Sequence, residues 1–395
     1  MAKAKKIKVK VKRNLPIKKS VVKEKSKSEI SANLVIPKIK IIGIGGAGGN
    51  ALNRLDGAVK NAETIAINTD AQDLKSTKAH KKIQIGKELT LGRGAGMDPQ
   101  LGENSALLSK DEILKALEGA ELIFITCGLG GGTGSGAAPV VAQLARSLNI
   151  LTIAIVTLPF SFEGEERKNI AQNAWDKLNQ SCDSLITISN DRIFNLISRD
   201  TSLKKAFWQI DEVLREGVKA IIDLIIKPGL INVDFADLKT IIQNSGPSLI
   251  GIGTSAGKER AIKAANLAIS SPLLNLTIEN ARKLLFNISS RGDLTMFEIQ
   301  QAAKAITSAV SPNAKIIFGT SLDYSLTKNK LKIVVIAGDF EGRNASTENL
   351  NAKLEIKFEE QKKEPTLAKD LLEERIKPFE EFEEPTFLRK KKKLA

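Results

Sequence analysis

Two glycine-rich turns, each following an apolar segment, constrain the fold of this chain more than any other feature. The first closes the segment KIKIIGIGGAGGN (residues 38–50), whose glycines spell G-x-G-x-x-G. The second lies in ELIFITCGLGGGTGSGAAP (residues 121–139), which is richer still in glycine. Glycine lets backbone N–H groups approach a phosphate closely, and the N-terminus of a following helix adds partial positive charge. Both turns therefore predict strand-to-helix junctions that bind phosphate.

Apolar, strand-length runs alternate with helix-length segments between about residues 38 and 190. Five such runs are KIKIIGIG, AETIAINT, AELIFITCG, ILTIAIVTLP and SLITIS. They are short and apolar on both faces, which is typical of strands in a parallel sheet covered by helices on both sides. The hydrophobic content of 42% over 395 residues is enough for a sizeable core.

Residues 203–227, LKKAFWQIDEVLREGVKAIIDLIIK, have an apolar stripe with steps of three and four, formed by Leu203, Phe207, Ile210, Leu214, Val218, Ile221 and Ile225. This spacing predicts a long amphipathic helix that ends at Lys227, before the breaker Pro228-Gly229. At about 1.5 Å per residue the helix would span roughly 37 Å. Four more strand-like runs follow: SLIGIG, KLLFNIS, AKIIFGTS and KLKIVVIAG. The sequence thus predicts an α/β fold in which a long central helix joins a parallel-sheet nucleotide-binding domain to a smaller α+β domain.

The predicted organisation also includes charged segments at both ends. We expect a disordered basic tail (1–37), a nucleotide-binding domain (38–202) and the central helix (203–228). A C-terminal domain (229–341), a flexible linker (342–380) and a terminal peptide (381–395) should follow. Residues 1–40 hold 14 lysines and arginines against two acids, so they account for most of the net charge of +15. We interpret the tail as solvated. Contact with an anionic membrane surface or nucleic acid is one alternative, and a transit peptide is another. The nearly neutral body predicts no specific nucleic-acid partner.

Scarce residue types exclude several kinds of chemistry. Two cysteines, Cys127 and Cys182, provide no disulfide framework and indicate a reducing, cytoplasmic compartment. The single histidine, His80, argues against a histidine-based metal site and against serine–histidine catalysis, and we expect it to be a plain surface residue. No apolar run reaches the about 20 residues that a membrane helix needs.

The first glycine turn alone fits a dinucleotide-dependent oxidoreductase. Such a site needs one glycine turn and an acidic residue about 20 positions further on, a position that Asp70 could fill. The second turn argues against this alternative, because two turns on one sheet can direct N–H groups at a single phosphate chain. The chain also has only one histidine and one tyrosine, Tyr324, so few side chains of these types could donate a proton in a hydride-transfer pocket. The lysine-containing phosphate-loop pattern is absent from the sequence.

Many ordered motifs resemble those of one family. GGGTGSG (130–136) resembles the tubulin-type GTPase signature, and the order of motifs from about residue 38 to residue 340 resembles FtsZ. The other motifs are GIGGAGGN, INTDAQDL, GRGAGMDP, PFSFEGEER, ISNDRIF, PGLINVDFADLKTI, SLIGIG, SSPLL and IIFG. The resemblance implies a tubulin-like fold, GTP/GDP binding with Mg²⁺, and head-to-tail self-assembly into filaments of the division ring. It also implies a cytoplasmic location at the division site, although organelle relatives leave a plastid location open.

The resemblance assigns nucleotide contacts residue by residue. The resemblance implies that the following residues contact the phosphates: Gly46, Ala47, Gly48, Gly49, Asn50, Asp70, Gly94, Ala95, Gly96, Gly132, Thr133 and Gly134. Asp70 is also implied to lie near Mg²⁺. Asn50 is also implied to contact the base or sugar. Glu163 and Arg167 match the ribose-contacting pair of the family, while the alternative for them is a surface ion pair.

Guanine carries an N1–H and an exocyclic amine, so a carboxylate suits it. The family has an Asn or Asp followed by an Asp on the central helix for this role, and this chain has Asp211-Glu212. The longer Glu212 departs from the pattern, which leaves open which carboxylate contacts the base.

The segment LINVDFADLK follows the central helix and carries Asn232, Asp234 and Asp237. On spacing alone, the two acids could simply cap a helix. The resemblance implies that these three residues complete the GTP site of a neighbouring subunit, where carboxylates could orient the hydrolytic water. A GTP-binding scaffold that does not hydrolyse the nucleotide is the alternative.

The terminal EPTFLRK, Glu384 to Lys390, resembles the short peptide by which the family binds membrane tethers and other division proteins. A proline, an aromatic–aliphatic pair and basic residues suit docking into a groove. The following lysines could add attraction to an anionic membrane surface.

Overall fold

The computed structural model describes residues 37–340, except residues 60, 196, 199, 228, 232 and 271–277. The basic tail up to residue 36, the predicted linker and the terminal peptide lie outside the described residues. Within the described part, no helix has the length and apolar character that crossing a membrane requires.

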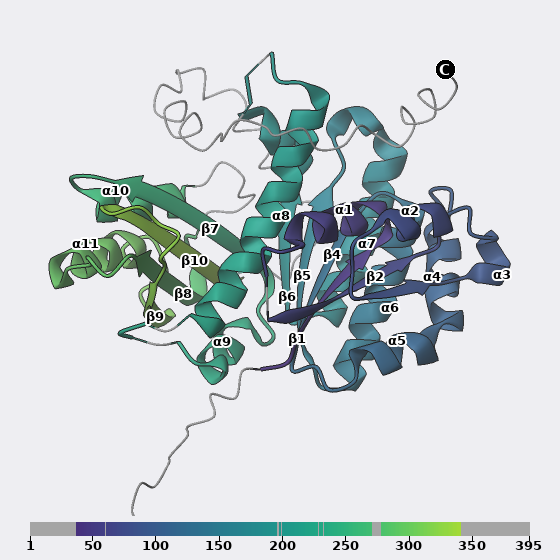
Figure 1. Cartoon of the computed structure of the whole chain (residues 1–395), viewed down its shortest axis with the longest axis horizontal. Helices are drawn as coiled ribbons and strands as arrows, with labels where there is room; N and C mark the ends of the chain where they lie inside the picture. Colours follow the sequence, from purple (N-terminus) through teal and green to yellow (C-terminus); the bar gives the residue numbers. More distant parts are fainter. Residues whose placement is uncertain are drawn as a thin grey trace, which may run out of the picture. The chain divides into compact units, whose positions relative to one another are not determined.

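The first six strands form the predicted parallel sheet. They are β1 (Ile39–Ile44), β2 (Ala62–Asn68), β3 (Lys81–Gln84), β4 (Leu122–Gly128), β5 (Leu151–Leu158) and β6 (Ser184–Ser189). Their order is β3-β2-β1-β4-β5-β6, and every neighbouring pair is parallel (Figure 1). Five of these strands match the apolar runs of the sequence. The remaining strand, β3, was not predicted because its four residues, KKIQ, contain no apolar run.

Helices cover both faces of this sheet, as predicted. They are α1 (Gly45–Leu55), α2 (Ala71–Ser76), α3 (Lys87–Thr90), α4 (Pro99–Leu108), α5 (Lys110–Leu117), α6 (Gly132–Ser147) and α7 (Glu165–Ser181), with 3₁₀ turns η1 (Ser161–Glu163) and η2 (Asn190–Asn195). Side chains of α4–α7 join one core with Ile42 and Ile44 of β1. Side chains of α1 and α2 join the other core with Ile39 and Ile41. Alternate β1 residues therefore enter opposite cores, because successive side chains of a strand point to opposite faces.

The predicted central helix is α8 (Leu203–Ile226), with Ser202 as its N-cap and Lys227 as its C-cap. Its 24 residues span about 36 Å. Leu214, Val218 and Ile221 are buried in the core that contains α1. The apolar stripe is thus confirmed in the middle of the helix.

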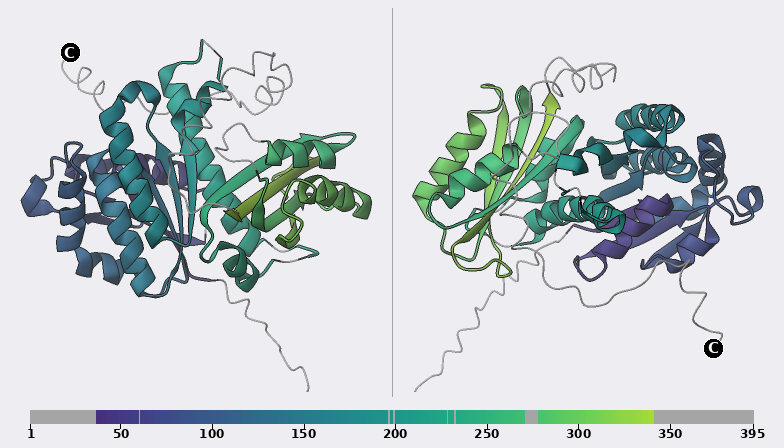
Figure 2. Two further views of the ribbon diagram at one scale, coloured as in Figure 1. Left: turned by 180° about the vertical axis from the view of Figure 1, so that it is seen from behind. Right: turned by 90° about the horizontal axis from the view of Figure 1, so that it is seen from above.

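The remaining elements form a smaller α+β unit. They are α9 (Phe235–Ile242), β7 (Gly246–Ala256), α10 (Arg260–Ile269), β8 (Ala281–Ser290), α11 (Met296–Thr307), β9 (Lys315–Leu322) and β10 (Lys330–Phe340). Strand β10 runs antiparallel to β7 and β8, whereas β8 and β9 are parallel, and α10 and α11 share a third core with these strands (Figure 2). β6 and β7 also pair in parallel, at residues 184–186 and 246–248. One sheet of ten strands therefore runs through both parts, a continuity that the sequence did not predict.

Candidate nucleotide-binding site

The two glycine turns lie side by side at the carboxyl edge of the sheet. β1 pairs with both β2 and β4, so these three strands end at one edge. Helix α1 starts at Gly45, directly after β1, and α6 starts at Gly132, shortly after β4. The sequence predicts glycine-rich turns at residues 46–50 and 132–134. The structure places them in the first turns of two helices.

The two helix starts contact one another and have no side-chain cap. A Cβ on Gly45 would lie 3.2 Å from the backbone nitrogen of Gly134. The hydroxyls of Thr69, at the end of β2, and Thr133 are hydrogen-bonded at 2.7 Å. The N-cap positions of both helices, Ile44 and Gly131, make no side-chain capping hydrogen bond. The first N–H groups of two helices therefore remain available to an anionic ligand at one place.

Close packing explains why glycine is required here even without a ligand. A Cβ on Gly48 would lie 2.6 Å from the carbonyl oxygen of Thr126 on β4, and one on Gly134 would lie 2.5 Å from that of Gly128. Each helix thus contacts strand backbone directly, which holds the N–H groups of its first turn rigidly in place.

The segment that contains Ala95 and Gly96 packs against the second helix start. A Cβ on Gly132 would lie 2.8 Å from the Cβ of Ala95. The backbone of Arg93 forms an isolated antiparallel β-bridge with that of Asp70. The segment therefore contacts both Gly132 and Asp70, although these residues come from separate parts of the sequence.

Two carboxylates lie beside the first helix start. Asp70 caps α2, because its Oδ1 accepts the N–H groups of Gln72 and Asp73 at 2.8 and 3.0 Å. Asp73 Oδ2 lies 3.4 Å from where a Cβ on Gly46 would be, and it accepts a hydrogen bond from Asn68 at 2.8 Å. Burial, and then the charge of Asp70, raise the pKa of Asp73, while the Asn68 bond opposes this rise. Asp73, the second acid of INTDAQDL, was not among the residues predicted from the sequence to bind the nucleotide.

A dedicated protein cage for a metal ion is absent from the described residues, which contain no group of three or more His, Cys, Asp or Glu side chains suited to one. Mg²⁺ commonly binds phosphate oxygens and water with only one or two carboxylates. The pair Asp70 and Asp73 fits that kind of site.

Glu163 and Arg167 form an ion pair of 2.5 Å, and Glu163 also accepts the N–H of Phe160 at 2.8 Å. A Cβ on Gly130 would lie 3.5 Å from the Cβ of Arg167. The pair is therefore fixed against the second glycine turn, as a ribose-contacting pair would need to be.

An aromatic cluster adjoins this ion pair. The rings of Phe162, Phe194 and Phe207 lie 4.8, 5.7 and 5.7 Å from the ring of Phe160. Phe160 is buried, whereas the other three are 70%, 55% and 45% exposed. Phe207 was assigned to the apolar stripe of the helix, and its exposure differs from that expectation. Exposed rings beside a phosphate site suit stacking of a nucleotide base.

Asp211 and Glu212 have different surroundings. Asp211 Oδ2 lies 3.8 Å from Arg54 Nε of α1, and the Arg54 guanidinium lies 6.0 Å from the Trp208 ring centre. Burial raises the pKa of Asp211 to about 6, and Arg54 opposes the rise. Both Glu212 carboxylate oxygens accept from Arg215, at 2.7 Å for the Nε bond.

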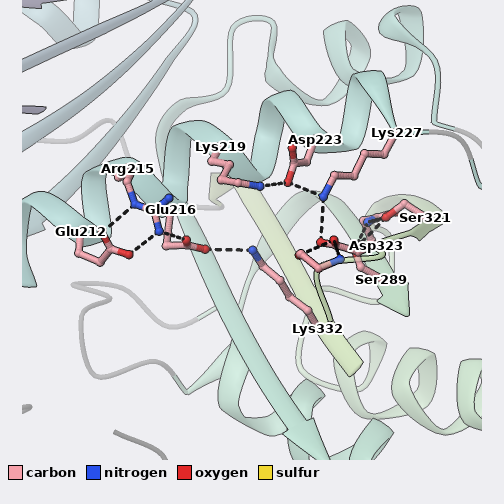
Figure 3. A network of polar contacts seen from close by, with 12 residues as sticks. Glu212, Arg215, Glu216, Lys219, Asp223, Lys227, Ser289, Ser321, Asp323 and Lys332 are labelled. Atoms are coloured by element: carbon pink, nitrogen blue, oxygen red, sulfur yellow. Dashed lines mark hydrogen bonds and ion pairs between the residues drawn. The ribbon is translucent and has the colours of Figure 1, made fainter. Parts of the chain in front are cut away.

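Arg215 continues this chain of contacts away from α1. It also pairs with Glu216 at 2.6 Å, and Glu216 pairs with Lys332 of β10 at 3.0 Å (Figure 3). Glu212 therefore belongs to an ionic network directed at the C-terminal unit, whereas Asp211 contacts the helix of the first glycine turn.

The remaining acids lie at the other end of α8. Asp234 caps α9, since its Oδ1 accepts the N–H of Asp237 at 2.7 Å. Asn232 lies outside the described residues. Lys227, the C-cap of α8, lies sixteen positions after Asp211, which is about 24 Å along the helix. No hydrogen bond or ion pair within the described part of the chain joins these acids to the glycine turns.

The cysteines and the histidine have structural surroundings. Cys127 and Cys182 are buried and free, and burial raises the pKa of each thiol to about 12. Such thiols are not nucleophiles at neutral pH. His80 is exposed, and its Nδ1 accepts the N–H of Thr64 at 3.0 Å, as a plain surface residue would.

Comparison with known proteins agrees with this geometry. The GTPase domain of the tubulin/FtsZ family matches residues 38–198, and the C-terminal domain of the FtsZ family matches residues 246–341. The empty FtsZ dimer of M. jannaschii is 44% identical over 78% of this chain and 89% of that chain, with a TM-score of 0.73. The GTPγS-bound CetZ2 protofilament of Haloferax volcanii is 22% identical over 82% of this chain and 99% of that chain, with a TM-score of 0.68, which shows a shared fold.

These matches place the fold and the glycine turns among the tubulin-type GTPases. Within that class, the chain belongs to the FtsZ family. The resemblance seen in the sequence and the predicted tubulin-like fold are both confirmed.

Proposed function

We propose that this protein is a polymerising GTPase of cell division, which assembles head-to-tail and hydrolyses GTP at the junctions between subunits. The observation that carries the proposal is that two uncapped helix starts, at Gly45 and Gly132, converge at one place, whereas Asp234 and Asp237 lie beyond the opposite end of α8. Family membership supports GTP binding, and the related structures are described as an FtsZ dimer and a CetZ2 protofilament.

Guanine is assigned to Asp211. Its carboxylate faces α1, and Phe207, one helical turn away, presents a half-exposed ring that can stack on a base. The Glu212 oxygens are occupied by Arg215. An ionised carboxylate accepts the two guanine donors, whereas adenine presents an acceptor at N1. This difference favours GTP over ATP.

Hydrolysis is assigned to acids supplied by a neighbouring subunit. About 24 Å of helix separates Asp211 from the end of α8, so one chain does not easily bring its own Asp237 to its own γ-phosphate. A head-to-tail contact is heterologous and generates an open filament. In such a filament Asp234 and Asp237, with Asn232, would orient the water that attacks the γ-phosphate. Mg²⁺ bound near Asp70 and Asp73 would neutralise phosphate charge.

The experiment incubates pure protein with GTP, GDP or NAD and follows sedimentable polymer and released phosphate together. GTP alone should produce both. Polymer without phosphate release would favour the non-hydrolysing scaffold. Binding of NAD without polymer would favour the oxidoreductase and refute the proposal.

Further partners follow from segments outside the described residues. We assign Glu384–Lys390 to binding of a membrane tether, and the basic tails to attraction by an anionic membrane surface. The proposed location is the cytoplasm at the division site, with a plastid as the alternative.

A further inference from the structure

The segment that follows α8 is held along strand β9 at residues 229–231. Thr320 donates its N–H to the carbonyl oxygen of Ile231 at 2.8 Å, and Thr320 Oγ1 accepts the N–H of Ile231 at 3.1 Å. A Cβ on Gly229 would lie 1.5 Å from the carbonyl oxygen of Thr320, so only glycine fits there. Val233 is buried in the core beneath α8. Strand β9 therefore sets the path of the chain toward Asp234.

An ion pair fixes the start of this segment. Lys227 Nζ lies 2.8 Å from Asp323 Oδ2 and 2.9 Å from Asp223 Oδ2 (Figure 3). Asp323, directly after β9, is anchored in turn, because its Oδ1 accepts the Ser325 N–H at 3.0 Å and its N–H donates to the Ser290 carbonyl oxygen at 2.8 Å. Burial alone would raise the pKa of Asp323, but hydrogen bonds from Lys227 and Ser325 hold it at about 2.

We propose that Lys227 and Asp323 are positioning residues for GTP hydrolysis, whose ion pair aims Asp234 and Asp237 at the nucleotide of the neighbouring subunit. The inference rests on the proposed function, because it presumes that these acids act across a subunit junction. Lys227 neutralises two carboxylates, Asp223 and Asp323. Without its charge they would repel one another where α8 meets β9, and the segment leading to Asp234 would shift.

The expected loss is large because catalytic geometry is strict. A misplacement of about 1 Å at a reacting group lowers the rate about 100-fold. The Asp323 side chain is only 9% exposed, so solvent does not replace the lost ammonium.

The chain offers two matched control lysines. Lys219 on α8 also pairs with Asp223, and Lys332 pairs with Glu216 and so links α8 to β10. Neither is bonded to Asp323. Lys219→Met tests the loss of one positive charge beside Asp223, and Lys332→Met tests the loss of a different link between α8 and the C-terminal unit.

The experiment compares Lys227→Met, Asp323→Asn and Lys227→Arg with the two controls in the full-length protein. GTP affinity is measured on monomers, and phosphate release is measured per polymerised subunit at saturating GTP. Lys227→Met and Asp323→Asn should lower kcat about 10- to 100-fold with KM changed less than about twofold, whereas Lys227→Arg and both controls should keep most of the turnover. When Lys227→Met is mixed into wild-type filaments, turnover should fall in proportion to the variant fraction, because each variant subunit disables one junction.

Two results would overturn the inference alone: Lys227→Met turning over like Lys219→Met, or Lys227→Arg failing to restore turnover while folding normally. If Lys227→Met does not fold, Asp323→Asn decides, since Lys227 keeps Asp223 as a partner in that variant. Wild-type protein without polymer-linked phosphate release would refute the proposed function and this inference together.

Discussion

The substitution Asp211→Asn separates binding from stability at the proposed guanine site. Burial raises the pKa of Asp211 from 3.8 to about 6, with Arg54 opposing the rise. A shift of that size corresponds to about 3 kcal/mol that opposes ionisation in the folded, nucleotide-free protein. The pKa of Asp211 is therefore higher in the folded than in the unfolded state. The contribution of its protonated carboxyl group to the free energy of unfolding is complete below about pH 4 and is lost as the pH rises through 6.

Replacing the carboxylate by a neutral amide should therefore stabilise the free protein at pH 7.5. We expect an increase of about 1–3 kcal/mol in the free energy of unfolding, which would appear as a melting temperature several degrees higher. Below about pH 3 the gain should vanish, because the carboxyl group of Asp211 is then largely protonated in both the folded and the unfolded state.

The same substitution should weaken GTP binding. Loss of a hydrogen-bonded charge costs about 1.5–3 kcal/mol, so the dissociation constant should rise about 10- to 150-fold. If guanine binds only the ionised form, a pKa of about 6 makes wild-type affinity about tenfold weaker at pH 5 than at pH 7. The Asp211→Asn protein should lack this part of the pH profile.

Calorimetric titration of GTP into dilute monomers, with thermal melts of the same samples, provides the assay. Glu212→Gln is the matched control, since Glu212 binds Arg215 and should leave GTP affinity near that of the wild type. Unchanged GTP affinity in Asp211→Asn, or a larger loss in Glu212→Gln, would refute the assignment.

Periodicity made the long elements predictable. The α8 stripe was visible because a buried face repeats over many residues, and nine strands were visible as short apolar runs. β3 escaped because it has four residues, two of them lysine. The pairing of β6 with β7 escaped because it involves only residues 184–186 and 246–248, which no local pattern connects.

The site was predictable where glycine marks it and unpredictable where the fold assembles it. Both glycine turns were identified from the sequence. The contact of Arg54 with Asp211 and the ring cluster around Phe160 join segments far apart in the chain. Neighbouring residues on a helix point about 100° apart, so Asp211 and Glu212 are distinguished only once the face that packs on α1 is known.

Three further predictions concern the tails and the shared site. Deleting residues 2–35 should leave sedimentable GTP-dependent polymer intact at moderate salt, because β1, the first strand of the sheet, begins at Ile39, after the deleted residues; failure to fold or assemble would contradict the domain boundary. Phe387→Ala should lower affinity for a membrane tether, measured on tether-coated vesicles, while GTP turnover stays near wild type; equal losses of both would mean that the peptide acts on the body. Asp237→Ala should bind GTP normally yet hydrolyse it slowly, giving long-lived polymers. Gly132→Ala should fail to bind GTP, because its Cβ would lie 2.8 Å from Ala95 Cβ and distort the second helix start. Mixing the two variants should restore some phosphate release, since a junction can pair an intact nucleotide site from one subunit with intact acids from the other. If both variants are folded and co-assemble but no mixing ratio restores phosphate release, hydrolysis must be completed within one chain.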